Sequence, residues 1–313
     1  MYRPAITRPS HEFHPSRSIA RGLAASAALG VGLLAAGLQD AGAVALLYND
    51  FSSLNGLQVN GQTAVIHGCA GGVPNGASCG AVTDFDGNKV LRLTNNTSQG
   101  GSAFSTTAIA LDQDASFSTA FRFRFSDQQN GGADGIVFTV QTNSNTSGGI
   151  GGGIGYQGLQ NSVGIEFDNW FNGGLDPNGN HVGIDLDGDV NSKVTSIDIA
   201  DLDNPQNIFT AWVDYDGVND LLEVRVNTTG IRPVAALLSY TVDLVSVLGQ
   251  TDAFVGFTSG TGFAGADHDI LSWQFNSTFD PIDQIGDVPE PAGTALLGIG
   301  LLGAARLRRR HRA

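Results

Sequence analysis

The chain of 313 residues contains 16 lysine and arginine residues against 30 aspartate and glutamate residues, which gives a formal net charge of −14. This excess of acid argues against nucleic acid as a partner, because the phosphates would be repelled. It is compatible with calcium, a hard cation that takes carboxylate and carbonyl oxygens as ligands.

The first 43 residues have the composition of an export signal. Four arginines lie within residues 1–21, and an uncharged run rich in Ala, Gly and Leu extends from Gly22 to about Leu38. Ala41-Gly42-Ala43 then provides the small-x-small spacing that signal peptidase accepts. A transmembrane anchor is the less favoured alternative, because an apolar run of roughly 17 residues is at the short limit for crossing a bilayer. We predict a signal peptide over residues 1–43 and an exported protein.

The two cysteines of the chain, Cys69 and Cys79, lie in one glycine-rich stretch. Exported proteins meet an oxidising environment in which disulfides form and persist. We therefore predict that the two cysteines close a short disulfide loop, and two free thiols are the alternative.

The pattern over residues 44–286 predicts a single domain of short β-strands separated by clusters of Gly, Asn and Asp. Over residues 117–125, four phenylalanines and a threonine alternate with a largely polar set, as expected for a strand with one buried face. Further strands are predicted over Lys89–Thr94, Gly135–Gln141, Ser162–Asp168, His181–Leu186, Phe209–Tyr215, Leu221–Asn227, Leu237–Val242, Ala253–Ser259 and Ile270–Asn276. A helical turn is expected at Leu244–Leu248, and Trp212 and Trp273 are predicted to lie in the core. The fold predicted is all-β, an antiparallel jelly-roll β-sandwich.

A group of metal-binding side chains stands between residues 166 and 181. Residues two apart on a strand point to the same face, so Glu166 and Asp168 present two carboxylates side by side. Two anions that close repel each other unless a cation lies between them. A transition metal such as manganese would take Glu166, Asp168, Asp176 and His181, whereas calcium would take Asp168, Asp176, Asn172 and a backbone carbonyl. The segment therefore predicts a pair of metal ions.

This segment resembles the metal-binding segment of the legume-type (L-type) lectins. The family's pattern is E-x-D-x-aromatic-x-N, followed by an aspartate and by a histidine five residues later, and every ligand type is present here. The resemblance implies a concanavalin-like fold. It also implies that Trp170 gives a backbone carbonyl to calcium and stacks its ring on a sugar.

Three other segments match the same family in order. Ala133-Asp134-Gly135-Ile136-Val137-Phe138 resembles A-D-G-x-x-F, which implies that Asp134 binds sugar and follows a cis peptide bond. Gly151-Gly152-Gly153-Ile154-Gly155 resembles G-G-x-L-G, which implies that the Gly152 N–H reaches the sugar. The stretch from His268 to Phe275 resembles the closing strand. The loop before it, with Phe263 and Ala264, falls where the family sets its sugar preference.

These residue types suit a sugar on chemical grounds as well. A sugar offers paired hydroxyls and an apolar C–H face. Asp134 can accept two hydroxyl protons in charge-assisted hydrogen bonds, while the Gly152 N–H and the Asn172 amide donate in return. The metals would hold Asn172, Trp170 and the Asp134 loop in place in advance, which removes an ordering cost from binding.

Three other interpretations of these residues are weaker. Retaining glycosidases on related jelly rolls carry E-x-D-x-x-E, and the sixth position here is Phe171, so the second catalytic carboxyl is missing and we predict no enzymatic activity. Asp185 to Asn191 lacks the glutamate of an EF-hand, because Ser196 stands at the twelfth position, so a strand followed by an aspartate-rich turn is favoured. His268 is predicted to be structural.

The C-terminal residues 287–313 form a second processing signal. Val288-Pro289-Glu290-Pro291 precedes an apolar stretch from Ala292 to Ala305, and five arginines follow by Arg312. This order resembles the PEP-CTERM sorting signal of Gram-negative bacteria, which implies recognition by an exosortase-type enzyme. An apolar stretch followed by basic residues predicts a transient inner-membrane anchor. The expected destination is the cell surface, the outer membrane or an extracellular matrix.

Together the sequence predicts a non-catalytic lectin that depends on calcium and manganese or another transition metal and binds a glycan or exopolysaccharide. One rival is a structural matrix or adhesion protein that keeps the lectin fold without sugar affinity. The other rival is a jelly-roll glycoside hydrolase. The resemblance is also compatible with a homo-oligomer, because members of the family often pair their sheets.

Overall fold

A computed structural model of the chain describes residues 44–66, 89–111, 114–145 and 150–286. The predicted signal peptide, the two cysteines and the C-terminal sorting signal therefore lie outside the described residues. Within the described ranges no helix is long and apolar enough to span a membrane. The two apolar runs singled out above lie outside those ranges.

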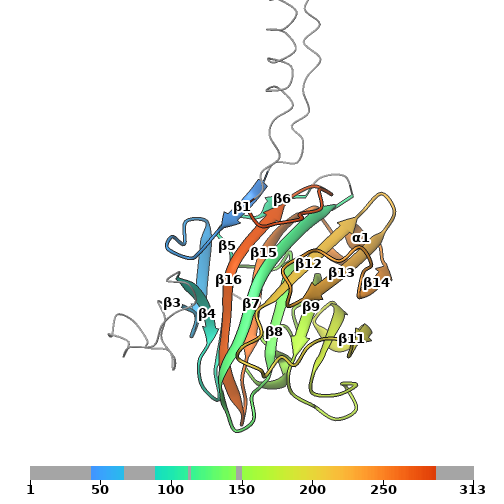
Figure 1. Cartoon of the computed structure of the whole chain (residues 1–313). Helices are drawn as coiled ribbons and strands as arrows, with labels where there is room; N and C mark the ends of the chain where they lie inside the picture. Colours follow the sequence, from blue (N-terminus) through green and yellow to red (C-terminus); the bar gives the residue numbers. More distant parts are fainter. Residues whose placement is uncertain (1–43, 67–88, 112–113, 146–149, 287–313) are drawn as a thin grey trace, which may run out of the picture. The chain divides into compact units, whose positions relative to one another are not determined.

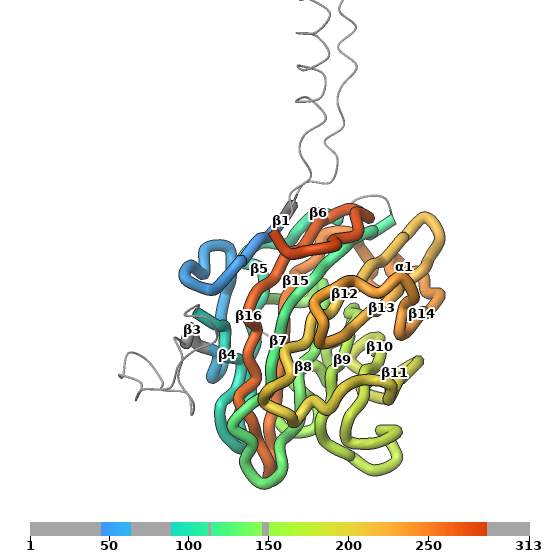
Figure 2. Tube along the Cα trace, in the orientation of Figure 1, coloured from blue at the N-terminus to red at the C-terminus, as the bar shows by residue number. Residues whose placement is uncertain are grey.

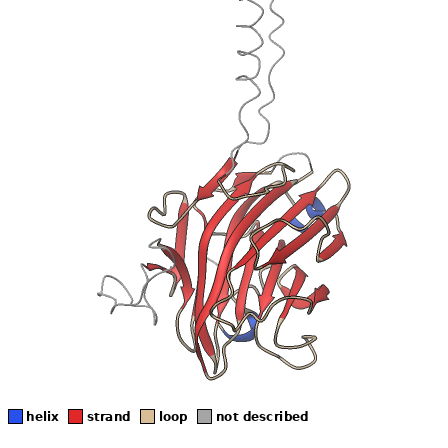
Figure 3. Cartoon of the chain, viewed as in Figure 1, coloured by secondary structure: helices blue, strands red, loops and turns tan. Residues whose placement is uncertain are grey.

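Almost every regular element of the described residues is a strand (Figure 3), and the strands pair into two antiparallel sheets (Figure 1). The first sheet has the order β14 (Leu238–Thr241), β13 (Leu221–Asn227), β12 (Phe209–Asp216), β7 (Phe117–Gln129), β16 (Gly265–Asn276), β4 (Val90–Thr94) and β3 (Ala64–Ile66), and β1 (Val44–Tyr48) also pairs with β16. The second sheet has the order β11 (Asp189–Ser196), β10 (His181–Leu186), β9 (Ser162–Asp168), β8 (Gly135–Gln141), β15 (Asp252–Gly260), β5 (Gly100–Ser105) and β2 (Leu57–Gly61), and β6 (Ile109–Ala110) also pairs with β15. This arrangement confirms the predicted all-β sandwich.

The core lies between the two sheets and is rich in aromatic rings. The alternating phenylalanines of β7 are all buried, as their spacing predicts. The ring of Phe121 meets Phe257 of β15 at a centroid distance of 5.0 Å and Phe167 of β9 at 5.7 Å, both edge to face. Trp273 of β16 also packs on Phe257, at 4.9 Å. Such pairs stabilise a core beyond the area that they bury.

Trp212 is buried, as predicted, at 1% exposure. It belongs to a small second core cluster with Ala120 and Ile282, on the face of the first sheet opposite the inter-sheet core. Its neighbours Ala211 and Val213 face the inter-sheet core. Because side chains alternate along a strand, Trp212 has to point away from it.

One short helix follows the prediction closely. Helix α1 spans Leu244–Leu248 and buries Leu244 and Leu248. Asp243 caps its first turn by accepting a hydrogen bond from the Ser246 N–H at 3.0 Å. Gly249 ends the helix with a φ of 74°, a left-handed conformation that glycine adopts without steric cost.

Candidate functional site

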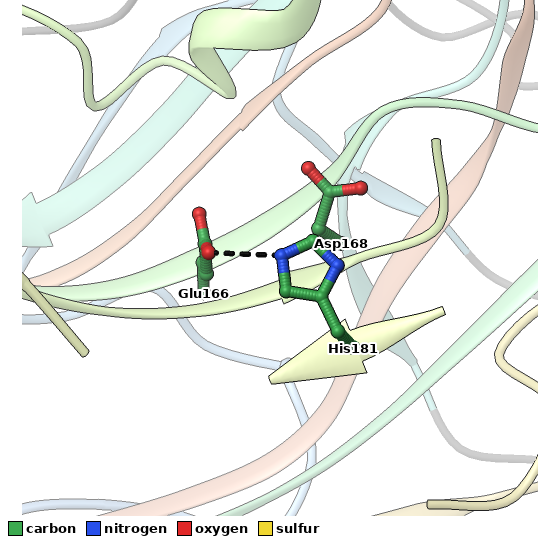
Figure 4. A group of neighbouring side chains, drawn as sticks. All are labelled: Glu166, Asp168 and His181. Atoms are coloured by element: carbon green, nitrogen blue, oxygen red, sulfur yellow. Dashed lines mark hydrogen bonds and ion pairs between the residues drawn. The ribbon is translucent and has the colours of Figure 1, made fainter. Parts of the chain in front are cut away.

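Three of the predicted metal ligands meet where strand β9 ends and the neighbouring strand β10 begins. Asp168 is the last residue of β9 and stands opposite His181, the first residue of β10, while Glu166 stands opposite Gly183. Ligand atoms of Glu166, Asp168 and His181 all lie within 4.8 Å of one another (Figure 4). All three side chains are buried, and His181 Nε2 is 3.1 Å from Glu166 Oε1.

The charges of this cluster favour a cation. Burial raises the pKa of Asp168 well above its usual range, and the neighbouring Glu166 raises it further, while the Trp170 N–H, 2.7 Å from Asp168 Oδ1, opposes the shift. Two buried carboxylates and an imidazole are a ligand set that suits a transition metal ion. The residues present therefore fit the metal that the sequence predicts.

Asp176, the fourth predicted ligand of that metal, stands slightly apart. Its Oδ2 accepts a hydrogen bond from the N–H of Asn172, so the two residues close the loop between β9 and β10. Burial raises the pKa of Asp176, and the neighbouring His181 lowers it, which places the carboxylate beside the cluster. Asp176 is thus near the three clustered ligands but outside the group of histidine and acidic residues whose ligand atoms lie within 4.8 Å.

A second layer of side chains supports the cluster and was missed by the sequence analysis. Ser192 Oγ lies 2.6 Å from Glu166 Oε1 and 2.6 Å from Asp185 Oδ1. A side chain at Gly183 would not fit, since its Cβ would lie 2.1 Å from Ser192 Oγ and 2.4 Å from Glu166 Oε1. The spacing from His181 to Asp185 puts both on one face of β10, a signal that could have placed Asp185 here.

Asp134 lies at the start of β8, after a cis Ala133–Asp134 peptide bond as the resemblance implies. It is buried at 3% exposure, and its Oδ2 has no hydrogen-bond partner among the described residues. Burial raises the pKa of Asp134 to about 6, the Gly262 N–H donates to the carboxylate and lowers it, and the charge of Asp176 raises it. A buried acceptor without a partner is costly unless a ligand supplies a donor.

Two further predicted sugar-binding residues meet beside Asp134. Gly152 belongs to the short 3-10 helix η1, Gly151–Gly153, and a Cβ on it would lie only 2.3 Å from Asn172 Nδ2. The η1 segment is held by the Gly151 N–H, which donates to Thr261 O at 3.0 Å. A Cβ on Gly262, the glycine that donates to Asp134, would be 3.6 Å from Asp134 Oδ2 and 3.6 Å from Gly151 Cα. Loops from three parts of the chain therefore converge at this point.

The remaining predicted contact residues differ in exposure. Trp170 is half-buried, and its Cζ3 would lie 3.9 Å from a Cβ on Gly131, next to the Asp134 loop. Phe263 is 80% exposed, and its carbonyl accepts a hydrogen bond from Asn130 Nδ2 at 2.8 Å. Ala264 is 1% exposed and offers almost no surface to a ligand.

Asp203 supports the Asp134 loop from a distant part of the chain. Its Oδ1 accepts a hydrogen bond from Asn169 Nδ2 at 2.8 Å and would lie 2.2 Å from a Cβ on Gly132. The Asn169 N–H donates to Asp134 O at 3.2 Å, so Asn169 connects Asp203 to the site. No signal in the sequence points to Asp203, because it lies in an irregular stretch 34 residues after Asn169.

Known proteins are similar to this chain in both sequence and fold. The legume lectin domain family matches residues 78–291, and the PEP-CTERM protein-sorting motif matches residues 287–310. Leucoagglutinating phytohemagglutinin of Phaseolus vulgaris is 32% identical over 207 residues, which cover 60% of this chain and 74% of that protein. An L-type lectin-domain containing receptor kinase VIII.1 of Arabidopsis thaliana is 30% identical over 171 residues, 52% of this chain and 24% of the kinase. The chain thus spans about a quarter of the length of that kinase.

Solved structures agree with these relatives. The lectin from Bauhinia forficata in complex with GalNAc superposes with a TM-score of 0.58 at 25% identity, over 74% of this chain and 96% of that one. Peanut lectin gives a TM-score of 0.57 at 25% identity, over 74% of this chain and 95% of that one. The family match covers more than half of the chain, and the fold agrees with it. The chain therefore belongs to the legume lectin domain family and carries a PEP-CTERM protein-sorting motif at residues 287–310.

Proposed function

We propose that the chain is an exported, non-catalytic lectin that binds a monosaccharide unit of a glycan at Asp134, Gly152 and Asn172. The observation that carries the proposal is the buried Asp134 Oδ2, which lacks a hydrogen-bond partner among the described residues. A sugar hydroxyl would supply the missing donor, and a charge-assisted hydrogen bond of this kind is about twice as strong as a neutral one. The GalNAc complex of the Bauhinia forficata lectin supports a monosaccharide as the ligand class.

The role of each contact follows from its chemistry. Ionised Asp134 would accept protons from two neighbouring hydroxyls, and the Gly152 N–H and the Asn172 amide would donate to the same hydroxyl oxygens. Trp170, half-buried beside the Asp134 loop, would cover the apolar face of the ring. Phe263, at 80% exposure, would contact neighbouring units and influence sugar preference.

Glu166, Asp168, Asp176 and His181 would hold a transition metal such as manganese, and Asp168, Asn172, Asp176 and the Trp170 carbonyl would hold calcium. The bound cations would compensate the negative charge of the buried carboxylates. Trp170 and Asn172 belong to both the calcium set and the sugar-binding set, so the metal loop would fix the sugar contacts before the ligand arrives.

The absence of catalysis is part of the proposal. Phe171 occupies the position at which related glycosidases carry their second carboxyl group, and it is 56% exposed. Glycoside hydrolysis needs two carboxyl groups. The sorting motif at residues 287–310 supports export and processing by an exosortase-type enzyme, with the cell surface or an extracellular matrix as the destination.

A glycan array tests the proposal. We expect the full chain, loaded with calcium and manganese, to bind a subset of glycans and to lose that binding in EDTA or in the Asp134→Ala variant. Binding to no glycan with both metals present would favour the structural matrix protein instead. Release of reducing sugar that disappears in a Glu166→Gln variant would show a hydrolase.

A further inference from the structure

A cavity lies on the first of the two sheets, away from Asp134. It measures about 620 Å³, within the ~300–1,000 Å³ that is usual for small-molecule sites. Its lining includes Arg122, Thr210, Trp212 and Ser272, which belong to strands of the first sheet. Asp134, by contrast, adjoins strand β8 of the second sheet.

Arg122 lines the cavity from β7, the strand between β12 and β16. It lies on β7 directly opposite Thr210 of β12 and Ser272 of β16, and Figure 2 shows these three strands side by side. Phe121 and Phe123, its neighbours along β7, are buried in the inter-sheet core. Because side chains alternate, Arg122 points to the opposite face of the sheet, together with two hydroxyl groups.

The segment after β16 forms one wall and is fixed to the same face of the sheet. The Asp280 N–H donates to Ser118 Oγ at 3.0 Å, and the Gly286 N–H donates to Gln274 Oε1 at 2.9 Å. Residues 283–285 of this segment line the cavity. The wall is therefore in place before any ligand binds, which lowers the ordering cost of binding.

Trp212 contributes a hydrogen-bond donor without an acceptor. Its ring is buried against Ala120 and Ile282, and its Nε1 has no hydrogen-bond partner among the described residues. The buried indole of Trp273, in contrast, donates to Thr119 Oγ1 at 3.0 Å. Buried indole N–H groups usually find an acceptor, and because Trp212 also lines the cavity, a ligand bound there could supply one.

Arg122 likewise lacks a counter-ion. Its guanidinium forms no ion pair and no hydrogen bond with any of the described residues. Other arginines of the described chain are paired with carboxylates, namely Arg92, Arg124, Arg225 and Arg232. Asp283 is the only acid among the lining residues, and it is exposed and does not pair with Arg122. An unpaired guanidinium in a chain of net charge −14 provides a local attraction for an anion.

We propose that this cavity is a second glycan site, which binds a saccharide unit carrying a carboxylate, as a uronic acid does. The planar guanidinium of Arg122 can hold a carboxylate through two parallel hydrogen bonds. The Trp212 N–H and the Thr210 and Ser272 hydroxyls can pair with ring and hydroxyl oxygens. The one guanidinium matches the single negative charge of a uronate unit.

Calorimetric titration of the full chain with tri-galacturonate tests this site. The methyl-esterified trisaccharide is the matched ligand, because it keeps the hydroxyls and removes the charge. We expect binding of the uronate, at least tenfold weaker binding of the ester, and at least tenfold weaker uronate binding in Arg122→Gln. Trp212→Phe, which removes the N–H and keeps an aromatic ring, is expected to weaken binding about fivefold. Lys193→Gln removes a cation from the second sheet and should bind as the unmodified chain does.

The outcomes separate this site from the Asp134 site. Uronate binding that persists in Asp134→Ala and is lost in Arg122→Gln supports the second site, whatever the glycan array gives. Binding that is lost in Asp134→Ala and unaffected by Arg122→Gln overturns it, as does equal affinity for the ester. Displacement by inorganic phosphate at concentrations equal to the uronate would also overturn it, because a simple anion site needs no sugar. Arg122 lies outside the core, so Arg122→Gln is expected to fold. It therefore still tests the site if Trp212→Phe does not fold.

Discussion

Position 152 needs a glycine for a reason that lies in another loop. A Cβ there would lie 2.3 Å from the Nδ2 of Asn172, closer than real Cβ contacts allow. The two residues are 20 positions apart in sequence, and both are proposed to hydrogen-bond the same sugar hydroxyls. A side chain at Gly152 would therefore displace the Asn172 amide and fill the site at the same time.

We predict that Gly152→Ala reduces glycan binding at least tenfold, because the methyl group excludes the Asn172 amide from its place. The unfolding temperature should change little, since η1 lies in a surface loop. Gly174→Ala is the matched control, because a Cβ at Gly174 meets no atom within 4 Å. The glycan array compares the two variants. Equal glycan binding by Gly152→Ala and Gly174→Ala would contradict the prediction.

His268 is predicted to make stability depend on pH. Burial lowers the pKa of His268 to about 3, with Arg92 lowering it further and Asp269 opposing both, and Nδ1 lies 2.6 Å from Thr94 Oγ1. The unfolded chain takes up a proton near pH ~6.5, which the folded chain cannot do. Protonation therefore favours the unfolded chain, and the free energy of unfolding falls as the pH drops from about 6.5 towards 3. The loss is about 2 kcal/mol at pH ~5.

Urea unfolding of the unmodified chain and of His268→Gln at pH 8 and pH 5 measures this effect. The variant lacks the titrating group, so its free energy of unfolding should fall less between the two pH values, by about 2 kcal/mol. An equal fall in both proteins would mean that His268 is protonated in the folded state.

At the scale of elements, a buried ion network joins β4 to β16. Arg92 Nε and Nη2 contact the two carboxylate oxygens of Asp269 at 2.6 Å and 2.8 Å, and Nη1 contacts Asp267 Oδ2 at 2.5 Å. Both aspartates are fully buried. Asp269 stands directly opposite Arg92, next to a shift of the strand register between His268 and Asp269.

Arg92→Met is expected to lower the free energy of unfolding by about 3–5 kcal/mol, because it leaves two buried carboxylates with little compensation. Arg124→Met is the control. Arg124 contacts the same Asp269 at 3.5 Å but is 19% exposed, so its loss should cost less. Urea titration measures the free energy of unfolding of both variants. An equal loss of this free energy in Arg92→Met and Arg124→Met would mean that Arg92 is not the main stabilising residue of the network.

At the scale of the whole molecule, metal binding is predicted to stabilise the domain. A cation that binds the folded chain at 100 times its Kd adds about 2.7 kcal/mol, because the unfolded chain lacks the site. For a domain of this size that corresponds to a rise in the unfolding temperature of roughly 5–10 °C. EDTA should lower the unfolding temperature by this amount, and calcium with manganese should restore it.

The variant with both Glu166→Ala and His181→Ala is the control for this measurement, because it removes two of the clustered ligands. Its unfolding temperature should fall less in the chelator than that of the unmodified chain, because the transition-metal ligands are lost while the proposed calcium ligands remain. Unchanged melting of the unmodified chain in EDTA would count against bound metal, and equal sensitivity of the variant would place the metal elsewhere.

The sequence alone determined the fold class, most of the central strands and the grouping of Glu166, Asp168 and His181. The bounds of β8, β9, β10 and β13 agree with the pattern, because a period of two is a local property of the backbone. The pattern did not predict β1, β2, β3, β5, β6 and β11. Of these, Gly100–Ser105 is rich in small residues and Asp189–Ser196 is largely polar, so neither shows a clear apolar alternation. Glu166, Asp168 and His181 could be grouped because they stand on adjacent strands separated by a single loop.

Only the tertiary structure decided what meets across distant segments. It brought the Gly262 N–H to Asp134, placed Gly152 against Asn172, and set Asp203 behind the Asp134 loop. It also turned Trp212 away from the core and left Arg122 without a counter-ion in a cavity. The physical reason is that alternation shows which residues share a face of a strand. Which face is covered, and by which segment, depends on sheet order and packing, and these are set by residues far away in the chain.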